Sequence, residues 1–271
     1  MNFSKNRPTV SLIISTYNWP KALKLVLESA LNQTHPPNEI LIADDGSKQN
    51  TRDIITSIQK QTEIPIIHVW HEDNGFRLSK IRNKAILKST SDYIIQIDGD
   101  TIINRNFVKD HLHASKKNSF ITASRVLLGK EISSNFINYG FKKVNPFTIG
   151  ITNRLNTLHF PFINQFIKYK RTPINKLIYK VRGCNMAFWK KDLLEVNGYN
   201  EDITGWGRED SELALRLLKK GVFLKKIKWS SIQYHLYHKE APRDNFLENQ
   251  SFLEKSILSE SFITTNGIQK T

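Results

Sequence analysis

"YIIQIDGD" (Tyr93–Asp100) joins an apolar run directly to two carboxylates, and "ILIADDGS" (Ile40–Ser47) shows the same pattern earlier in the chain. Short apolar runs that end in turn residues are typical of strands buried on both faces of a sheet. In open α/β sheets, ligands bind beyond the carboxyl ends of the strands. The two acidic clusters therefore predict a ligand site along one edge of a parallel sheet.

The first hundred residues alternate strand and helix patterns around these two runs. Strands are expected at Val10–Ile14, Glu39–Ala43, Ile64–Val69 and Tyr93–Ile97. A first helix is expected to be capped by Asn18, to hold Pro20 in its first turn and to end at Pro36-Pro37. Further helices are expected around Ile54–Ile58 and over Leu78–Leu87. Repeated strand–helix–strand units of this length predict an α/β fold, with a mostly parallel sheet and helices on both faces.

The composition excludes several classes of protein. With 271 residues, of which 39% are hydrophobic, the chain can bury a large core without a covalent staple. The single cysteine, Cys184, excludes an intrachain disulfide framework and a four-cysteine zinc site. No apolar run reaches the length of a membrane span, and no signal-peptide core is present. We expect a soluble, cytoplasmic protein.

The chain is strongly basic, with a formal net charge of +15, which attracts phosphate in a nucleotide, a nucleic acid or a membrane. Residues 132–191 contain no Asp or Glu, but eleven Lys or Arg and eleven aromatic residues. This acid-free segment is either a solvated insertion over the core or a surface for an anionic, partly apolar partner. A membrane that carries lipid-linked substrate is such a partner.

The acidic clusters have a functional and a structural interpretation. Asp98 and Asp100 flank Gly99 and can converge on Mg²⁺ or Mn²⁺, although Asp-Gly is also a common turn pair. The Asp44-Asp45 pair can accept hydrogen bonds from a base or a ribose, or can form a turn.

Two further clusters lie in the second half of the chain. Trp206 to Asp210 precede a helix pattern that stops at Gly221, so Asp210 is either a helix-terminal cap or a general base beside a tryptophan platform. His235 and His238 are either structural or complete a mixed nitrogen and oxygen metal site with Asp100.

Together these pieces resemble glycosyltransferase family 2. The nucleotide-binding half of that family is matched by "SLIISTYN" (Ser11–Asn18), "ILIADDGS", "NGFRLSKIRNKAI" (Asn74–Ile86) and "YIIQIDGD". The run Arg182–Gly221 is similar to the acceptor half of bacterial chondroitin polymerases and β-1,4-galactosyltransferases. "YHKEAP" (Tyr237–Pro242) extends the likeness to the polymerases.

The resemblance implies a GT-A type fold, a Rossmann-like mostly parallel sheet with an acceptor-binding second half. Residues 1–112 would form the nucleotide-sugar-binding half, and residues 113–242 the acceptor-binding and catalytic half of the same domain. The pattern over Asn245–Ile263 is amphipathic, and residues 243–271 are expected to form a C-terminal helical tail.

For the donor, the resemblance implies that Ser15 and Tyr17 cradle uracil and ribose and that Asp45 contacts the uracil. Arg77 matches a basic residue near the diphosphate, and Arg82 and Asn83 form the adjoining element.

For the metal, Asp98 and Asp100 match the DxD element, with Asp98 directed to ribose or metal, and His238 matches a third ligand of Mn²⁺ or Mg²⁺. His235 stands where the galactosyltransferases carry a methionine ligand, and whether it also binds the ion is left open.

For the acceptor, Trp206 and Glu209 match sugar contacts and Asp210 matches the general base. The galactosyltransferases have glycine and aspartate where this chain has Arg208 and Ser211. Arg208 is expected either to bind an acidic or phosphorylated acceptor or to reach solvent.

The implied activity is metal-dependent, inverting transfer from a UDP-sugar to a hydroxyl of a saccharide or lipid-linked saccharide, in surface polysaccharide or lipopolysaccharide synthesis. Peripheral attachment to the inner face of the plasma membrane is a hypothesis that rests on the acid-free segment.

Three alternatives remain. A nucleotidyltransferase would need a glycine-rich, basic phosphate loop where the chain has Ser15 to Asn18. A nucleic-acid-binding protein fits the charge, but no such motif is present and the acidic clusters would repel a phosphate backbone, so no nucleic-acid partner is expected. A catalytically inactive carbohydrate-binding relative is disfavoured because every expected carboxylate is present.

Overall fold

The computed structural model describes residues 7–166 and 178–270. Its first half contains β1 (Val10–Thr16), α1 (Pro20–Leu31), β2 (Glu39–Asp44), α2 (Gln49–Gln59), β3 (Ile66–Trp70), α3 (Leu78–Lys88) and β4 (Tyr93–Asp98). There follow β5 (Thr101–Ile103), α4 (Phe107–Ala114), β6 (Ser119–Thr122), β7 (Val126–Leu128), α5 (Lys130–Tyr139) and β8 (Ile151–Thr152). The 3₁₀ helices η1 (Arg154–Thr157), η2 (Pro161–Gln165) and η3 (Ile178–Lys180) precede β9 (Asn185–Trp189), α7 (Lys190–Glu195), α8 (Glu209–Lys219), β10 (Phe223–Lys226), β11 (Gln233–His235) and α9 (Phe246–Leu258).

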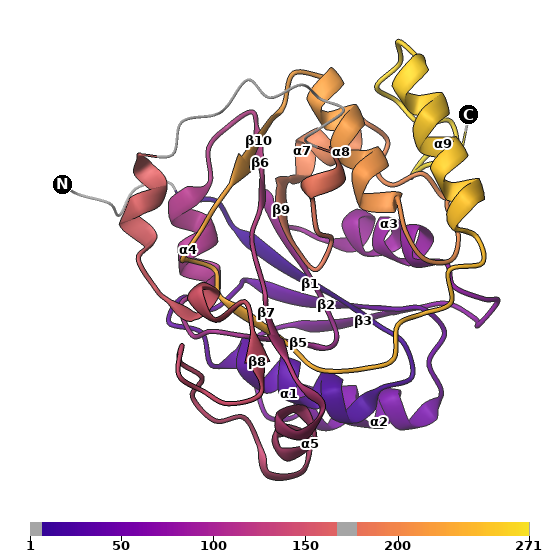
Figure 1. Cartoon of the computed structure of the whole chain (residues 1–271). Helices are drawn as coiled ribbons and strands as arrows, with labels where there is room; N and C mark the ends of the chain where they lie inside the picture. Colours follow the sequence, from indigo (N-terminus) through magenta and orange to yellow (C-terminus); the bar gives the residue numbers. More distant parts are fainter. Residues whose placement is uncertain (1–6, 167–177, 271) are drawn as a thin grey trace.

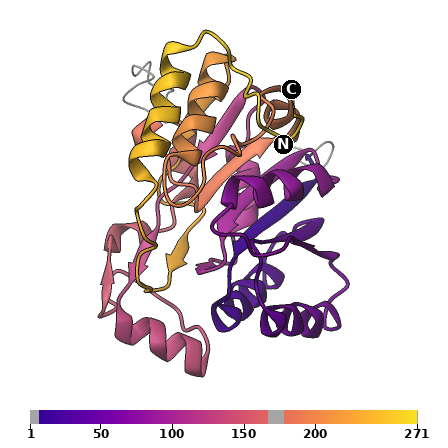
Figure 2. The same cartoon turned by 90° about the vertical axis from the view of Figure 1, so that its right-hand side faces the viewer.

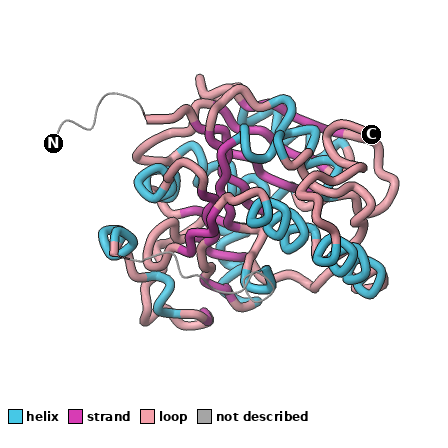
Figure 3. Tube along the Cα trace, turned by 90° about the horizontal axis from the view of Figure 1, so that it is seen from above, coloured by secondary structure: helices cyan, strands magenta, loops and turns pink. Residues whose placement is uncertain are grey.

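A seven-stranded sheet in the order β10-β6-β9-β4-β1-β2-β3 runs through the molecule, with helices on both sides (Figures 1 and 3). β1 is parallel to β2 and β4, β2 is parallel to β3, and β10 is parallel to β6. Only β9 runs antiparallel, between β4 and β6. A second sheet has the order β5-β11-β7-β8. The mostly parallel α/β sheet is confirmed.

The core lies in two layers because successive side chains of a buried strand point to opposite faces. In β1, Leu12 and Ile14 join the cluster under α1, α2 and α4, and Ile13 joins the cluster under α3, α7 and α8. Both faces of the central strands are therefore covered, as Figure 1 shows. Such burial explains why their sequences are continuously apolar rather than alternating.

The expectation that Asn18 caps α1 is wrong. The residue before α1 is Trp19, and no side chain caps that helix. Asn18 has a left-handed backbone, with φ of 45°, and its side-chain oxygen accepts a hydrogen bond from the Lys48 N–H at 2.9 Å. Its own N–H donates to Ser47 Oγ at 2.8 Å. Asn18 therefore ties the loop after β1 to the loop after β2.

The tail begins with α9, which packs against α8 through the buried Leu253. The expectation of a helical tail over residues 243–271 is correct only for Phe246–Leu258, because residues 259–270 contain no helix. Residues 264–268 lie against residues 197–201 instead. Within the described residues, no helix combines the length and the apolar character that crossing a membrane requires.

Candidate active site

Arg82 of α3 is the centre of a buried cluster of charged groups at the carboxyl edge of the sheet. Its Nε donates to Ser15 Oγ at 3.2 Å, and its two terminal nitrogens lie 3.1 Å from carboxylate oxygens of Asp98 and Asp210. Glu209 is 3.7 Å away. The pairing of Ser15 with Asp98 in the β1–β4 register brings the first two partners together. One guanidinium thus joins the strand ends to the start of α8.

The carboxyl groups around Arg82 have unusual protonation equilibria. Burial, and then the neighbouring charge of Asp210, raises the pKa of Glu209 to about 8, although Arg82 opposes the shift. Burial likewise raises the pKa of Asp98 to about 6. One oxygen of Glu209, Oε2, is buried without a hydrogen-bond partner among the described residues. Burial therefore favours the protonated form of the Glu209 carboxyl group.

The backbone of Gly183 lies directly against the Asp210 carboxylate. A Cβ at this position would lie 2.0 Å from Asp210 Oδ2, which is far inside van der Waals contact. The carbonyl of Gly183 accepts a hydrogen bond from Gln96 of β4 at 3.0 Å, so its backbone is fixed. Asp210 therefore reaches Arg82 only because residue 183 has no side chain.

The end of β2 forms a second polar group with Asp45 at its centre. His71 Nε2 lies 2.6 Å from one oxygen of Asp45, and the Arg77 N–H donates to the other at 2.8 Å. Burial raises the pKa of Asp45, while the bond to His71 acts in the opposite direction. Tyr17, which is half exposed, donates its hydroxyl hydrogen to Asp73 at 2.8 Å. Three of the residues expected at the donor base, Ser15, Tyr17 and Asp45, thus lie around the ends of β1 and β2.

Asp100, His235 and His238 form a cluster whose candidate ligand atoms all lie within 4.8 Å of one another. Asp100 Oδ2 is 3.0 Å from Nε2 of His238 and 3.7 Å from Nε2 of His235. The other oxygen of Asp100 is buried without a partner among the described residues. His238 Nδ1 donates to the Lys239 carbonyl at 2.8 Å, so Nε2, which faces Asp100, is the nitrogen that would bind a cation in place of its own proton.

An orphaned carboxylate oxygen beside two imidazoles fits a divalent cation that accepts oxygen and nitrogen ligands, such as Mn²⁺. Asp98, which was also expected to bind the ion, has one oxygen on Arg82 and is outside this three-residue cluster.

A row of aromatic rings and guanidinium groups borders the start of α8. The Arg208 guanidinium lies between the rings of Tyr179 and Phe246, at 5.0 and 4.7 Å from their centroids. Arg243 lies 4.5 Å from the ring of Trp206, which also packs on Phe246. Arg208 therefore packs against two aromatic rings.

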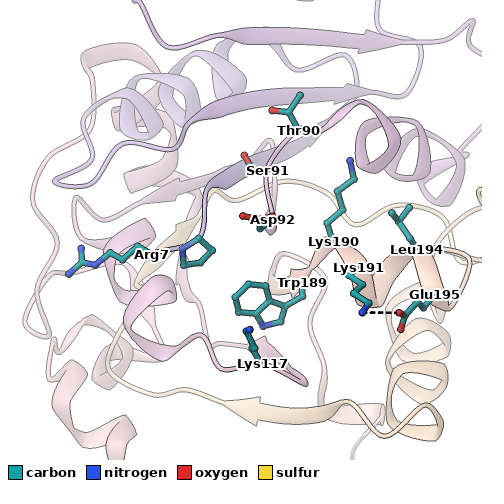
Figure 4. Close-up of a pocket in the computed structure, with 11 residues that line it drawn as sticks. Arg7, Thr90, Ser91, Asp92, Lys117, Trp189, Lys190, Lys191, Leu194 and Glu195 are labelled. Carbon is teal, nitrogen blue, oxygen red and sulfur yellow. Dashed lines mark ion pairs between the residues drawn. The ribbon is translucent and has the colours of Figure 1, made fainter. Parts of the chain in front are cut away.

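A cavity of about 840 Å³ opens at the opposite, amino-terminal edge of the sheet (Figure 4). Trp189, Lys190 and Asp92 line it, and Lys191 pairs with Glu195 at 3.7 Å on its rim. The carboxylates around Arg82 and the cluster of Asp100, His235 and His238 lie at the other edge, where ligands of α/β sheets bind. We therefore place the candidate active site around Arg82 and Asp100.

Sequence analysis missed the central part that Arg82 plays and did not single out His71 or Gly183. The run "NGFRLSKIRNKAI" contains Arg82, but a buried arginine inside a helix has no sequence mark that separates it from an exposed one. Gly183 lies in the Arg182–Gly221 match, where the glycine itself was the available signal.

Comparisons with known proteins show which family and fold the chain shares. The model of the family described as glycosyl transferase family 2 matches residues 11–178, and the model described as the N-terminal domain of galactosyltransferase matches residues 167–239. A chondroitin synthase of Pasteurella multocida (strain Pm70) is 28% identical over 250 residues, covering 86% of this chain. A hyaluronan synthase of Pasteurella multocida is also 28% identical, over 256 residues and 86% of this chain. The chain spans 25% of the length of each synthase.

Among solved structures, residues 1–349 of Staphylococcus aureus TarS superpose with a TM-score of 0.64 at 15% identity, over 93% of this chain and 66% of that one. The mannosyltransferase PcManGT of Pyrobaculum calidifontis, in complex with GDP-Man and Mn²⁺, gives 0.61 at 16% identity, over 94% and 72%. The expected GT-A fold is thereby confirmed. Because the first family model covers more than half of the sequence, the chain belongs to glycosyl transferase family 2.

Proposed function

We propose that this protein is an inverting glycosyltransferase that moves a sugar from a UDP-sugar to a hydroxyl group of a saccharide acceptor. The observation that carries the proposal is Arg82, which joins the donor-side Ser15 and Asp98 to Asp210 at the start of α8. Two parts of the chain that the resemblance assigns to different substrates therefore meet at one buried charge.

The donor would lie over the ends of β1 and β2. Asp45, with Ser15 and Tyr17 beside it, would bind the uracil and ribose, and Arg77 would lie near the diphosphate. TarS has been solved with UDP and with UDP-GlcNAc, which supports a uridine donor, whereas PcManGT binds GDP-Man. The donor nucleotide therefore has to be tested with both bases.

Asp100 and His238 would hold a Mn²⁺ or Mg²⁺ ion, with Asp98 and His235 beside them. A divalent cation at such a site supplies positive charge that stabilises a departing diphosphate. The mannosyltransferase neighbour, solved with Mn²⁺, supports this assignment.

Asp210 would take the proton from the acceptor hydroxyl as its oxygen attacks the anomeric carbon, and one displacement without an enzyme nucleophile inverts the configuration. Arg82 orients this carboxylate through an ion pair of 3.1 Å. Protonated Glu209 would act as a hydrogen-bond donor to the acceptor rather than as a competing base. Trp206 would offer its ring to the acceptor sugar.

The resemblance to polysaccharide synthases supports an assignment to bacterial surface polysaccharide or lipopolysaccharide synthesis. The fixed positive charge of Arg208 next to Glu209 would suit an acidic or phosphorylated acceptor.

Calorimetric titration of UDP, with and without Mn²⁺, tests the donor half of the proposal. We expect UDP to bind more tightly with Mn²⁺ than without it. In Asp100→Ala, the UDP affinity measured with Mn²⁺ should be lower than that of the wild type by roughly tenfold or more. Asp210→Asn should bind UDP like the wild type, yet lose about a hundredfold to ten-thousandfold in transfer rate. Asp53→Asn is the matched control, since Asp53 is an exposed carboxylate of α2 that accepts a bond from Gln49.

If GDP bound tightly and UDP did not bind, only the choice of a uridine donor would be contradicted. Absence of binding for both nucleotides, with or without Mn²⁺, would contradict the proposed function.

A further inference from the structure

The loop between α5 and β8 exposes two large apolar side chains almost completely. Phe147 is 89% exposed and Ile149 is 88% exposed, and Tyr139 and Leu155 on either side are also largely in solvent. Single exposed apolar residues are normal on a protein surface. Several within one short stretch are unusual and mark a surface that contacts something else.

This loop is held in a fixed conformation, so its exposure does not come from a loose chain. The Asn145 N–H donates to Thr148 Oγ1 at 3.0 Å, and the Phe147 N–H donates to Asn145 Oδ1 at 2.9 Å. Arg154 donates to the carbonyls of Pro146 and Thr148 at 2.9 and 2.8 Å. The apolar side chains are therefore presented outward by a turn that a neighbouring arginine braces.

Both ends of the loop are anchored in a hydrophobic cluster. Val144 and Ile151 are buried, and they share that cluster with Tyr234 of β11, the strand that ends at His235. In Figure 2, α5 and the loop after it form a corner of the molecule below the second sheet. The exposed loop is thus fixed to the same small sheet that carries the three-residue metal cluster.

The charged residues of this stretch of sequence are all basic. Lys142 and Lys143 are exposed, Arg154 adds a third cation, and no Asp or Glu lies between Glu131 and Asp192. Exposed aromatic and aliphatic side chains that share a stretch of chain with lysine and arginine complement an anionic lipid surface, where apolar groups enter the interface and cations meet headgroups.

We propose that residues 139–155, called here the docking loop, bind the surface of an anionic lipid bilayer. Phe147 and Ile149 enter the interface, and Lys142, Lys143 and Arg154 contact the headgroups. This binding goes beyond sugar transfer and does not depend on it. Its consequence is that the metal cluster is held close to lipid, where a lipid-linked acceptor would be found.

Co-sedimentation with vesicles of phosphatidylcholine, alone or mixed with phosphatidylglycerol, tests the docking loop. We expect the wild type to pellet with the mixed vesicles at low salt, to stay in solution with phosphatidylcholine alone, and to be released by high salt. The double variants Phe147→Ser with Ile149→Ser, and Lys142→Glu with Lys143→Glu, should each weaken binding by about tenfold or more.

The matched control is Leu247→Ser with Leu258→Ser on α9, since these leucines are 81% and 86% exposed. This control should bind vesicles like the wild type. UDP binding of every variant should be unchanged, which separates failure of the docking loop from failure of the proposed function.

Three results would overturn the proposal. The first is a wild type that ignores mixed vesicles at low salt, and the second is a control that loses as much binding as the loop variants. The third is a wild-type dimer that the Phe147 and Ile149 variant lacks in size-exclusion chromatography, because it would assign the loop to a second copy of the chain.

Discussion

Glu209 couples the stability of the fold to pH. Its folded-state pKa of about 8 lies above its ordinary value of 4.5, so the folded chain keeps a proton that the unfolded chain releases between these values. The stabilisation is complete below about pH 4.5 and is lost as the pH rises through about 8. The contribution of Glu209 to wild-type stability should therefore fall with pH across this window, by at most about 1.4 kcal/mol per pH unit.

Glu209→Gln should remove much of this decline, because a glutamine side chain does not titrate. Urea unfolding in the presence of a chelator, at several pH values between about 5 and 8, measures the effect. The slope that remains in the variant should come from Asp98, whose pKa is raised to about 6, and from His238, whose hydrogen bond to Asp100 raises its pKa to about 9. Parallel pH profiles for the wild type and the variant would contradict the buried, protonated glutamate.

Gly183→Ala should impair catalysis through displacement of Asp210. The new Cβ would occupy the position of the carboxylate, so Asp210 would leave Arg82, and the transfer rate should fall by roughly a hundredfold or more. UDP binding should remain.

The control for Gly183→Ala is Gly140→Ala, where a Cβ meets open space but φ is +87°. That variant should lose stability through backbone strain and keep its activity. A Gly183→Ala enzyme with the wild-type rate would mean that Asp210 does not need its present position.

The residues that sequence analysis could predict are those with local marks. Carboxylates after apolar runs identify Asp98 and Asp100, and a helix start identifies Asp210. The contacts of Arg82 span 16, 67 and 128 residues of chain, and no local pattern encodes such separations. The unexpected position of the Asn18 side chain has the same origin, because its partner Lys48 belongs to a different strand–helix unit.

At the scale of elements, β1 to β4 and the three helices between them could be predicted because each has a continuous apolar or periodic pattern. The second sheet could not. β5, β8 and β11 have only two or three residues each, which is too short for a period to be detected. Their pairing depends on contacts such as Thr101 with His235, which lie far apart in sequence.

Helix α3 connects the first half of the chain to the loop after α7 in the second half. Asn83 Nδ2 donates to the Tyr199 carbonyl at 2.9 Å, and the Tyr199 N–H donates to Asn83 Oδ1 at 2.8 Å. These reciprocal bonds hold the loop after α7 against the helix that carries Arg82.

Asn83→Ala should leave buried polar groups of Tyr199 unpaired and lower the free energy of unfolding by about 1–3 kcal/mol. It should also weaken UDP binding, since α3 would no longer be fixed beside the donor. Leu87→Ala, at a half-exposed position of the same helix, should change both properties little. Denaturant unfolding measures the change in stability, and calorimetry measures the change in UDP affinity. If Asn83→Ala bound UDP as tightly as the wild type, donor binding would not depend on how these bonds position α3.

At the scale of the whole molecule, residues 264–269 fold back onto the loop between α7 and α8. Asn197 Nδ2 donates to the carbonyls of Thr264 and Gln269 at 2.7 and 2.8 Å, and the Gln269 N–H donates back to Asn197 Oδ1 at 2.7 Å. Beside them, the Ile268 N–H donates to the Asn197 carbonyl at 3.0 Å. Residues 264–269 thus form a strap over the loop between α7 and α8, the same loop that Asn83 contacts.

Gly267 allows this strap to lie close to its partner, since a Cβ there would come within 1.9 Å of the Asn197 carbonyl oxygen. Gly267→Ala should therefore lift the strap and leave the buried amide of Asn197 without partners. The expected loss of about 1–3 kcal/mol corresponds to a fall in Tm of several degrees. Glu260→Ala, at an exposed position before the strap, should leave Tm unchanged, and calorimetric scans of the two variants compare them directly. An unchanged Tm for Gly267→Ala would show that the strap contributes nothing to the closure of the molecule.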